Sequence, residues 1–218
     1  MEKITLNGIW KMSQAGTEEW MDAAVPGSVM CELLKYNKLD DPFYRDNEII
    51  ARKAMEKDYE YVRTFTVSEE ILRQDRVLLR CYGLDTVADI YINDVKIASV
   101  NDMHRTYEFA VKEYLKAGEN IIRIYFFSAL EYIRKRAEEK PLPVNIVRAV
   151  EGFAYLRKAS NMFGWDSEPQ IPDMGIWRDI EIAAYSAARM DTLYVRQKHT
   201  EGRAEVKVEV PVEVWGSG

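Results

Sequence analysis

The residues most able to do chemistry in this sequence are Trp165 and Asp166, which stand side by side within the stretch 163–178. Two prolines, at positions 169 and 172, fix backbone dihedrals and remove hydrogen-bond donors, so we predict a stiff loop here. An indole offers a flat apolar face to the C–H groups of a sugar ring, and a carboxylate accepts hydrogen bonds from two neighbouring hydroxyls. The pair therefore suits recognition of a neutral sugar.

The sequence gives little support for a catalytic site. Retaining glycoside hydrolysis needs two carboxyl groups about 5–5.5 Å apart, one of them with a raised pKa. The adjacent acidic pairs are predicted in turns or at exposed helix starts and are interpreted as surface charge: Asp40-Asp41, Glu69-Glu70 and Glu138-Glu139. His104 and His199 lie in loop-like contexts without ligand-spaced neighbours, so we expect no zinc site and no catalytic triad. We expect no catalytic residue and no cofactor in this chain.

Composition bounds the class of protein. The chain has 218 residues and a net charge of −6, which argues against a nucleic-acid or anionic-membrane partner. Cys31 and Cys81 are predicted as buried small hydrophobes in a helix and a strand, and two thiols fit a reducing compartment. No apolar run approaches the roughly 20 residues of a membrane span, and the first residues lack the apolar core of a signal peptide. We expect a cytoplasmic protein.

Short segments with period-two alternation dominate the chain and predict an all-β fold, most simply a jelly-roll β-sandwich. Asn93-Asp94 is predicted as a tight hairpin turn, since both residue types tolerate positive φ. The expected strands span residues 5–12, 20–25, 61–67, 76–82, 87–93, 95–100, 107–111, 119–127 and 177–182.

A few short helices interrupt the strands. They are predicted over residues 29–36, 48–55 and 129–140, with one helical turn at 68–72 and a loop with a short helix in 144–160. Ser28 and Asn47 are the expected N-caps of the first two helices. Ile49 and Ile50 are expected to face inward, and the Asn47-Glu48 pair is interpreted as a capped helix start.

Several blocks resemble, in order, the N-terminal sugar-binding domain of β-mannosidases of glycoside hydrolase family 2. The resemblance covers roughly residues 4–183 and implies a galactose-binding-like jelly roll. It also implies a longer, retaining enzyme that hydrolyses terminal β-linked mannose without a cofactor. The blocks are Leu6-Asn7-Gly8-Ile9-Trp10, Val25-Pro26-Gly27-Ser28-Val29, Asp41-Pro42-Phe43-Tyr44-Arg45, Gly83-Leu84-Asp85-Thr86-Val87-Ala88, Gly164-Trp165-Asp166 with Pro169, and Gly175-Ile176-Trp177-Arg178.

The resemblance assigns the site. In this family the Trp-Asp loop lines the subsite for the terminal mannose, so Trp165 and Asp166 would recognise the distal hydroxyls, with Ser167 and Lys158 as further candidates. Without the resemblance, Trp165 would be interpreted as a core aromatic and Asp166 as a turn cap. Lys158 would either contact substrate or only form a salt bridge to Asp166. The family usually continues with Trp-Gly, whereas this chain has Ser167-Glu168, which favours either a shifted preference, such as an amino sugar, or a weakened site.

Two domains are expected. Residues 1–186 form the jelly roll, and residues 187–218 form the truncated start of an immunoglobulin-like domain, with a linker over 183–189. The tail is predicted to hold strands over 193–197 and 204–214, joined by a turn at 199–202. The catalytic barrel, one expected partner, would lie outside this chain, which alone would be inactive.

The other expected partners are a β-mannoside or manno-oligosaccharide and, through exposed tail strands, a second copy of the chain. Two alternatives stay open. The chain could belong to an exo-β-glucosaminidase or another family 2 exo-glycosidase, or it could act as a stand-alone carbohydrate-binding module.

Overall fold

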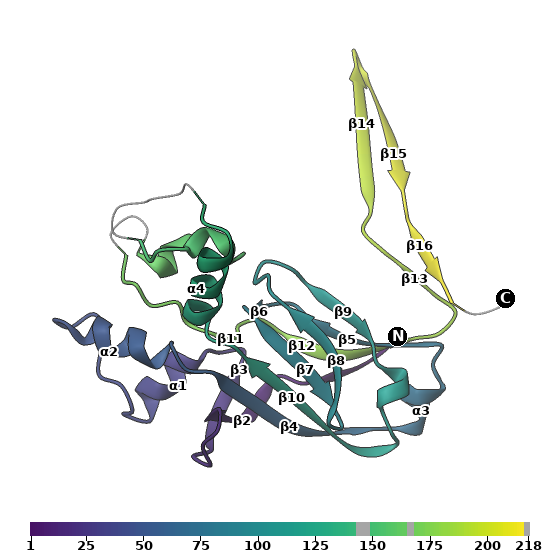
Figure 1. The fold of residues 1–218 in the computed structure, drawn as a ribbon. Coiled ribbons are helices and arrows are strands. Elements are labelled where there is room, and N and C mark those ends of the chain that lie inside the picture. Colours follow the sequence, from purple (N-terminus) through teal and green to yellow (C-terminus); the bar gives the residue numbers. More distant parts are fainter. Residues whose placement is uncertain (143–148, 165–167, 216–218) are drawn as a thin grey trace.

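Two antiparallel sheets form the body of the molecule in the computed structural model, which describes residues 1–142, 149–164 and 168–215 (Figure 1). Inward side chains of both sheets belong to one hydrophobic core, so the predicted β-sandwich is confirmed. The six-stranded sheet has the order β3 (Met21–Val25), β2 (Gly8–Gln14), β4 (Tyr59–Val67), β10 (Gly118–Phe126), β7 (Ala88–Ile92), β8 (Val95–Val100). The four-stranded sheet has the order β1 (Glu2–Thr5), β12 (Ile180–Tyr185), β5 (Arg76–Cys81), β9 (Tyr107–Ala110).

The period-two pattern in the sequence follows the burial of the strands. In β10, Ile122, Ile124 and Phe126 are completely buried, while Arg123 and Tyr125 point away from the core. The turn between β7 and β8 has positive φ at Asn93 and Asp94, 49° and 65°, as predicted. A short pair, β6 (Leu84–Asp85) with β11 (Gly175–Ile176), lies beside the two main sheets.

Two strand predictions and the linker prediction are wrong at their ends. The strand expected over 5–12 is two strands, because the chain crosses from the four-stranded to the six-stranded sheet at Leu6-Asn7, where the Leu6 N–H donates to Ile180 O. The strand expected from Trp177 begins at Ile180 instead. The expected linker 183–189 extends β12 to Tyr185 and then forms β13 (Ala188–Met190), because these residues still find sheet partners.

The four α-helices and η2 occur near their predicted positions, while η1 and η3 were not predicted. They are α1 (Val29–Lys35), α2 (Asn47–Ala54), α3 (Glu69–Arg73), α4 (Ala129–Glu139) and the 3₁₀ turns η1 (Lys112–Tyr114), η2 (Phe153–Tyr155) and η3 (Ser160–Phe163). The Ser28 hydroxyl accepts from the Cys31 N–H, which confirms that cap. In the described ranges no helix is both long and apolar enough to cross a membrane.

Two predictions about α2 are wrong. Asn47 does not cap the helix but is its first residue, preceded by Asp46, and its side-chain amide donates to Asp41 O at 2.9 Å. Ile49 and Ile50 are 48% and 57% exposed, because α2 turns Ala51 and Ala54 toward the core instead.

The two cysteines differ in their surroundings. Cys81 is buried as predicted, and burial raises the pKa of its thiol. Cys31 is exposed, contrary to the prediction, because it lies on the outer side of α1.

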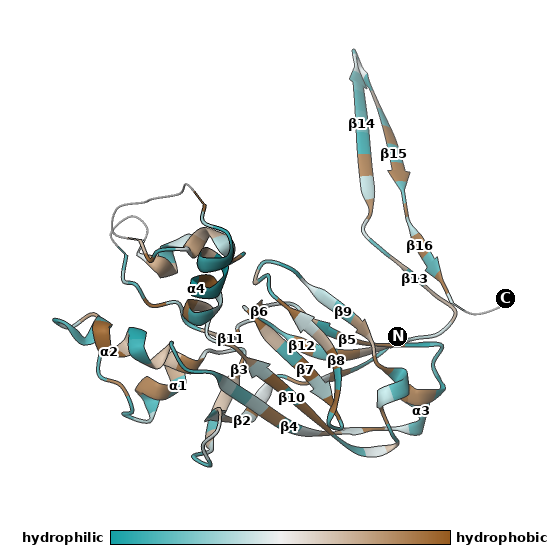
Figure 2. Cartoon of the chain, viewed as in Figure 1, coloured by the Kyte–Doolittle hydropathy of each residue, from teal (hydrophilic) through white to brown (hydrophobic). Residues whose placement is uncertain are grey.

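A two-stranded ribbon leaves the sandwich after β12 (Figure 1). It pairs β13 with β16 (Val212–Val214) and, farther out, β14 (Tyr194–Thr200) with β15 (Arg203–Glu209). His199 therefore lies in a strand rather than in a loop. Hydrophobic and polar stretches both occur along the ribbon (Figure 2), and Val195, Val206 and Val208 are more than half exposed on one of its faces.

Candidate functional site

The predicted sugar-recognising residues Trp165, Asp166 and Ser167 lie outside the described residues, and the structure describes the flanks on both sides of this stretch. On the N-terminal flank, η3 ends at Phe163, whose side chain is completely buried. The Phe163 ring lies 6.3 Å from the ring of Phe153, measured between centroids. This flank is therefore part of the hydrophobic core.

The C-terminal flank is fixed to the start of α1 through Asp173. The Asp173 carboxylate accepts the backbone N–H of Met30 at 3.0 Å and that of Met174 at 2.7 Å. Burial raises the pKa of Asp173, while hydrogen bonds from Ser28 and these two amides oppose the shift. The flank also buries Ile171 and Met174, so it too is held in one position.

Helix α2 holds the middle of this flank. The Gln170 N–H donates to the Glu48 carboxylate at 3.2 Å, and the Arg52 guanidinium donates to the Gln170 side chain. The Asn47-Glu48 pair thus has a structural contact in the first turn of α2, although the capping role given for Asn47 is wrong.

Lys158 connects the two flanks to the body of the domain. Its side chain is completely buried, and its ammonium group lies 2.5 Å from the carboxylate of Asp85 and donates to the carbonyl oxygen of Asp173 at 2.7 Å. Burial lowers the pKa of Lys158, and the charge of Asp85 opposes the shift. The Thr86 hydroxyl donates to the second oxygen of Asp85. We call Asp85, Lys158 and Asp173 the buried anchor.

Sequence reasoning found only one member of the anchor. Lys158 was predicted as a weak binding candidate, whereas Asp85 and Asp173 received no role. Both stand inside or beside sequence blocks that carry the family resemblance, which was the available signal. A substrate contact of Lys158 stays a prediction, and its suggested salt bridge to Asp166 involves a residue outside the described ranges.

Gly175 lets the loop return to the sheet against α1. Its φ is +152°, and a Cβ there would lie 2.8 Å from both Gly27 O and the Cα of Ser28. The hydroxyl of Tyr61 lies just beyond, at 3.3 Å from that position, and is buried without a hydrogen-bond partner among the described residues. Only glycine fits this close approach.

The described residues of the site hold the two flanks of the stretch 165–167 in place. They contain no group of three or more His, Cys, Asp or Glu that could hold a metal ion. The carboxylates of the anchor are occupied by Lys158, Thr86 and backbone amides.

Comparison with known proteins places this domain in a family. A family model described as "Glycosyl hydrolase 2 galactose-binding domain-like" matches residues 10–178. The chain belongs to this family. The predicted family 2 resemblance is therefore confirmed, and so is the galactose-binding-like fold.

Several members of glycoside hydrolase family 2 are similar to the chain. It is 32% identical over 195 residues to a β-mannosidase from Capra hircus. The matched region covers 86% of this chain and 22% of that protein. It is 26% identical over 226 residues to a probable β-mannosidase from Caenorhabditis elegans. This match covers 98% of this chain and 25% of that protein. The chain thus spans about a quarter of the length of these relatives.

Solved structures of glycosidases are also similar to the chain. A β-D-mannosidase from Dictyoglomus thermophilum superposes with a TM-score of 0.93 at 29% identity, over 98% of this chain and 26% of that one. An exo-chitosanase from Amycolatopsis orientalis, at 17% identity and a TM-score of 0.67 over 98% of this chain and 24% of that one, shares the fold.

Proposed function

We propose that the chain is the N-terminal substrate-recognition domain of a β-mannosidase-like glycoside hydrolase. The longer protein would release terminal β-linked mannose with retention, in the cytoplasm, using a catalytic barrel outside this chain. The observation that supports this most is the TM-score of 0.93 with a β-D-mannosidase across 98% of the chain. Sequence similarity to β-mannosidases over 195 residues supports it independently.

In this proposal the domain contributes recognition rather than bond cleavage. Trp165 would cover the apolar face of the terminal sugar and Asp166 would accept its hydroxyls. The buried anchor and the Glu48–Gln170 contact hold the described flanks of residues 165–167 in place. The conformational entropy of these flanks is therefore lost when the domain folds, and not when the substrate binds. The two carboxyl groups that retaining hydrolysis requires would come from the barrel.

The decisive experiment uses the full-length enzyme and an aryl β-mannoside. A charge-assisted hydrogen bond contributes about 1.5–3 kcal/mol, so Asp166→Ala should lower kcat/KM roughly ten- to a hundredfold. Asp40→Ala, an exposed carboxylate, is the matched control and should leave kcat/KM unchanged. A wild-type kcat/KM in Asp166→Ala would refute the recognition role, and measurable hydrolysis by the isolated 218-residue chain would refute the division of labour.

Another family 2 exo-glycosidase is the first alternative, with an exo-β-glucosaminidase as the specific case. The Ser167-Glu168 sequence favours it, because a carboxylate beside the sugar site suits an amino sugar. A panel of aryl β-mannosides, β-glucosaminides and β-glucuronides separates the cases: the highest kcat/KM should be on the mannoside.

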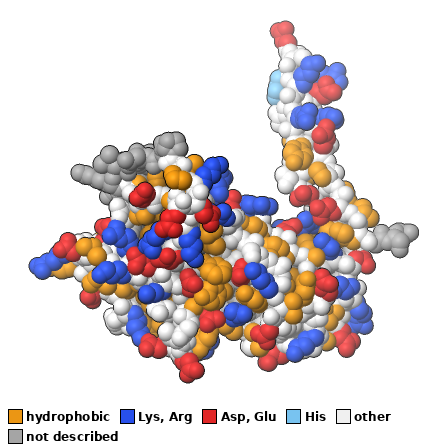
Figure 3. Space-filling model, in the orientation of Figure 1, with side chains coloured by type: hydrophobic (Ala, Val, Ile, Leu, Met, Phe, Trp, Pro, Cys, Tyr) orange, Lys and Arg blue, Asp and Glu red, His pale blue; other side chains and the backbone are white. Residues whose placement is uncertain are grey.

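A stand-alone carbohydrate-binding module is the second alternative, and one surface favours it. A groove of about 560 Å³ lies between the end of β10 and the base of α4, with Tyr125, Phe127 and Tyr132 in its wall. Hydrophobic side chains gather on this face beside charged ones (Figure 3). Calorimetric titration of the chain with mannose and manno-oligosaccharides tests it, since a module would bind at micromolar to millimolar strength and an unfinished half-site almost not at all.

The ribbon would begin an immunoglobulin-like domain covering residues 187–218 and continuing outside the chain. Its exposed valines support this, because a lone two-stranded ribbon is marginally stable and its apolar face needs cover. Alternatively, a second copy of the chain could pair with these strands and bury the same valines. Light scattering at increasing protein concentration distinguishes them, as only the second predicts dimers.

A further inference from the structure

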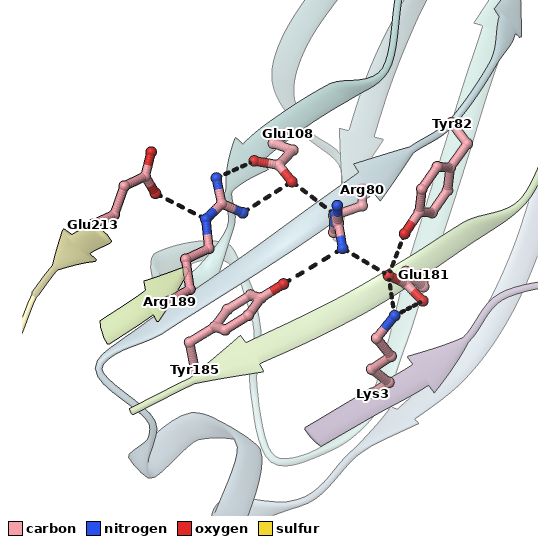
Figure 4. Close-up of polar contacts among 8 residues, drawn as sticks. All are labelled: Lys3, Arg80, Tyr82, Glu108, Glu181, Tyr185, Arg189 and Glu213. Carbon is pink, nitrogen blue, oxygen red and sulfur yellow. Dashed lines mark hydrogen bonds and ion pairs between the residues drawn. The ribbon is translucent and has the colours of Figure 1, made fainter. Parts of the chain in front are cut away.

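The outer face of the four-stranded sheet carries a continuous ladder of charged side chains (Figure 4). Lys3 donates to Glu181 at 2.9 Å, and Arg80 lies between Glu181, at 3.4 Å, and Glu108, at 2.7 Å. The hydroxyl of Tyr82 adds a hydrogen bond to Glu181 at 2.9 Å. Charges of alternating sign therefore run across β1, β12, β5 and β9.

Arg189 extends this ladder from the sandwich to the ribbon. Its two terminal nitrogens donate to the two oxygens of Glu108 at 3.0 and 2.6 Å, and its Nε donates to Glu213 on β16 at 2.9 Å. The side chains of Arg189 and Glu108 are only 15% and 25% exposed. A bidentate, partly desolvated pair holds both partners in one orientation and is stronger than an ordinary surface ion pair.

An apolar contact accompanies the ladder. Leu78, Ala183 and Tyr185 point outward from the four-stranded sheet and are nevertheless buried, with Trp215 packed against them. The rings of Tyr185 and Trp215 lie 5.6 Å apart, measured between centroids. The base of the ribbon thus covers a hydrophobic patch on the sheet, in addition to its ion pairs.

The main chain closes the same junction. The Ala187 N–H donates to the Asp75 carboxylate at 2.7 Å, and the Trp215 N–H donates to Ala187 O at 2.7 Å. Farther out, every residue of β14 is exposed. The contact with the sandwich is therefore concentrated at β13, β16 and Trp215.

We propose that the outer face of the four-stranded sheet is an intramolecular docking surface whose partner is the β13–β16 strand pair. Arg189 is its positioning residue, because it binds Glu108 on the sandwich and Glu213 on the ribbon at once. The ribbon then leaves in a fixed direction rather than swinging on a flexible linker.

Distance measurement between two spin labels tests this on the intact chain. Cys31 is exposed and takes one label, Glu201→Cys at the ribbon tip takes the other, and Cys81 is buried and unreactive. Docking predicts a narrow distance distribution that broadens at least twofold in Arg189→Met. Arg196→Met, an arginine on exposed β14, is the matched control and should stay narrow. A broad wild-type distribution, or an Arg189→Met distribution as narrow as wild type, would overturn the proposal.

Amide hydrogen exchange gives a second, independent measurement. Loss of the Arg189–Glu108 pair should accelerate exchange in residues 187–190 and 212–215 by about tenfold or more. Amides of β10 report whether the sandwich itself stays folded and should not change. If Arg189→Met also accelerates β10, Trp215→Ala decides, since it removes the apolar half of the same junction. Unchanged exchange at both ribbon segments in Trp215→Ala would then contradict docking.

Discussion

Lys158 and Asp85 form an ion pair whose two side chains are 0% and 5% exposed. Lys158 also donates to the main chain of Asp173, so one ammonium group joins β6 to the loop that follows residue 167. Burying two charges is costly, and their attraction offsets that cost only while both are present. The pair is therefore one of the contacts that fix this flank, together with those of Asp173 and Gln170.

Lys158→Met should destabilise the domain by about 3–5 kcal/mol, because it leaves the Asp85 carboxylate buried and uncompensated. Urea unfolding followed by circular dichroism measures the loss. The surface pair Lys38–Glu19 is the matched control, and Lys38→Met should cost less than about 1 kcal/mol. Adding Asp85→Asn to Lys158→Met should recover most of the loss. A double variant as unstable as the single one would show that lost packing, rather than unpaired charge, is the cause.

Gly175→Ala should be costly. Positive φ costs a residue with a Cβ about 1–2 kcal/mol, and overlap with the backbone of Gly27 and Ser28 adds about 1–3 kcal/mol. Gly202→Ala is the control, because its φ is also positive, at +70°, but no atom lies within 4 Å of the new Cβ. Thermal unfolding should show a distinctly larger fall in Tm for Gly175→Ala. Equal falls would mean that the loop moves away from α1 at little cost.

Glu48→Ala should loosen the loop without unfolding the domain. The variant removes the acceptor of the Gln170 N–H on the partly exposed α2. Exchange of the amides of residues 168, 170 and 171 should become roughly ten times faster, while β10 stays protected. Glu69→Ala, at an exposed position in the first turn of α3, is the comparison and should leave the loop unchanged. Unaltered exchange in Glu48→Ala would show that the remaining contacts of the loop are sufficient.

The sandwich was predictable because burial alternates along strands such as β4, β7 and β10, and the sequence records that alternation directly. Ile122, Ile124 and Phe126 are the clearest case. At Leu6-Asn7 the chain passes from the four-stranded to the six-stranded sheet. The sequence analysis missed this change of sheet because apolar and polar residues keep alternating through it. The exposure of Ile49 and Ile50 was missed for a related reason. Helical spacing identifies a face but does not say whether another element covers it.

The candidate site was predictable only in part. The stretch around Trp165 stands out by its residue types, and the role of Trp165 stays a prediction, whereas the contacts that hold the flanks of this stretch were not predicted. Lys158 and Asp85 stand far apart in the sequence and meet only because β6 and the segment before η3 are brought together by the fold. The patterns in a single sequence do not show which distant residues come into contact. The ladder through Arg189 and Glu108 escaped prediction for the same reason.

Docking of the ribbon should weaken in acid through Glu108. Burial alone would raise the pKa of this carboxyl, but Arg189 and Arg80 outweigh that effect and hold its pKa below the usual 4.5. A carboxyl with a lowered pKa contributes stability that is complete above pH 4.5 and is lost as the pH falls through the lowered value. Amide exchange in residues 187–190, corrected for intrinsic rates, should therefore accelerate relative to β10 below pH 4.5. Glu108→Gln should remove this acid step and Glu119→Gln, an exposed residue of β10, should keep it; an acid step that persists in Glu108→Gln would assign it to another group.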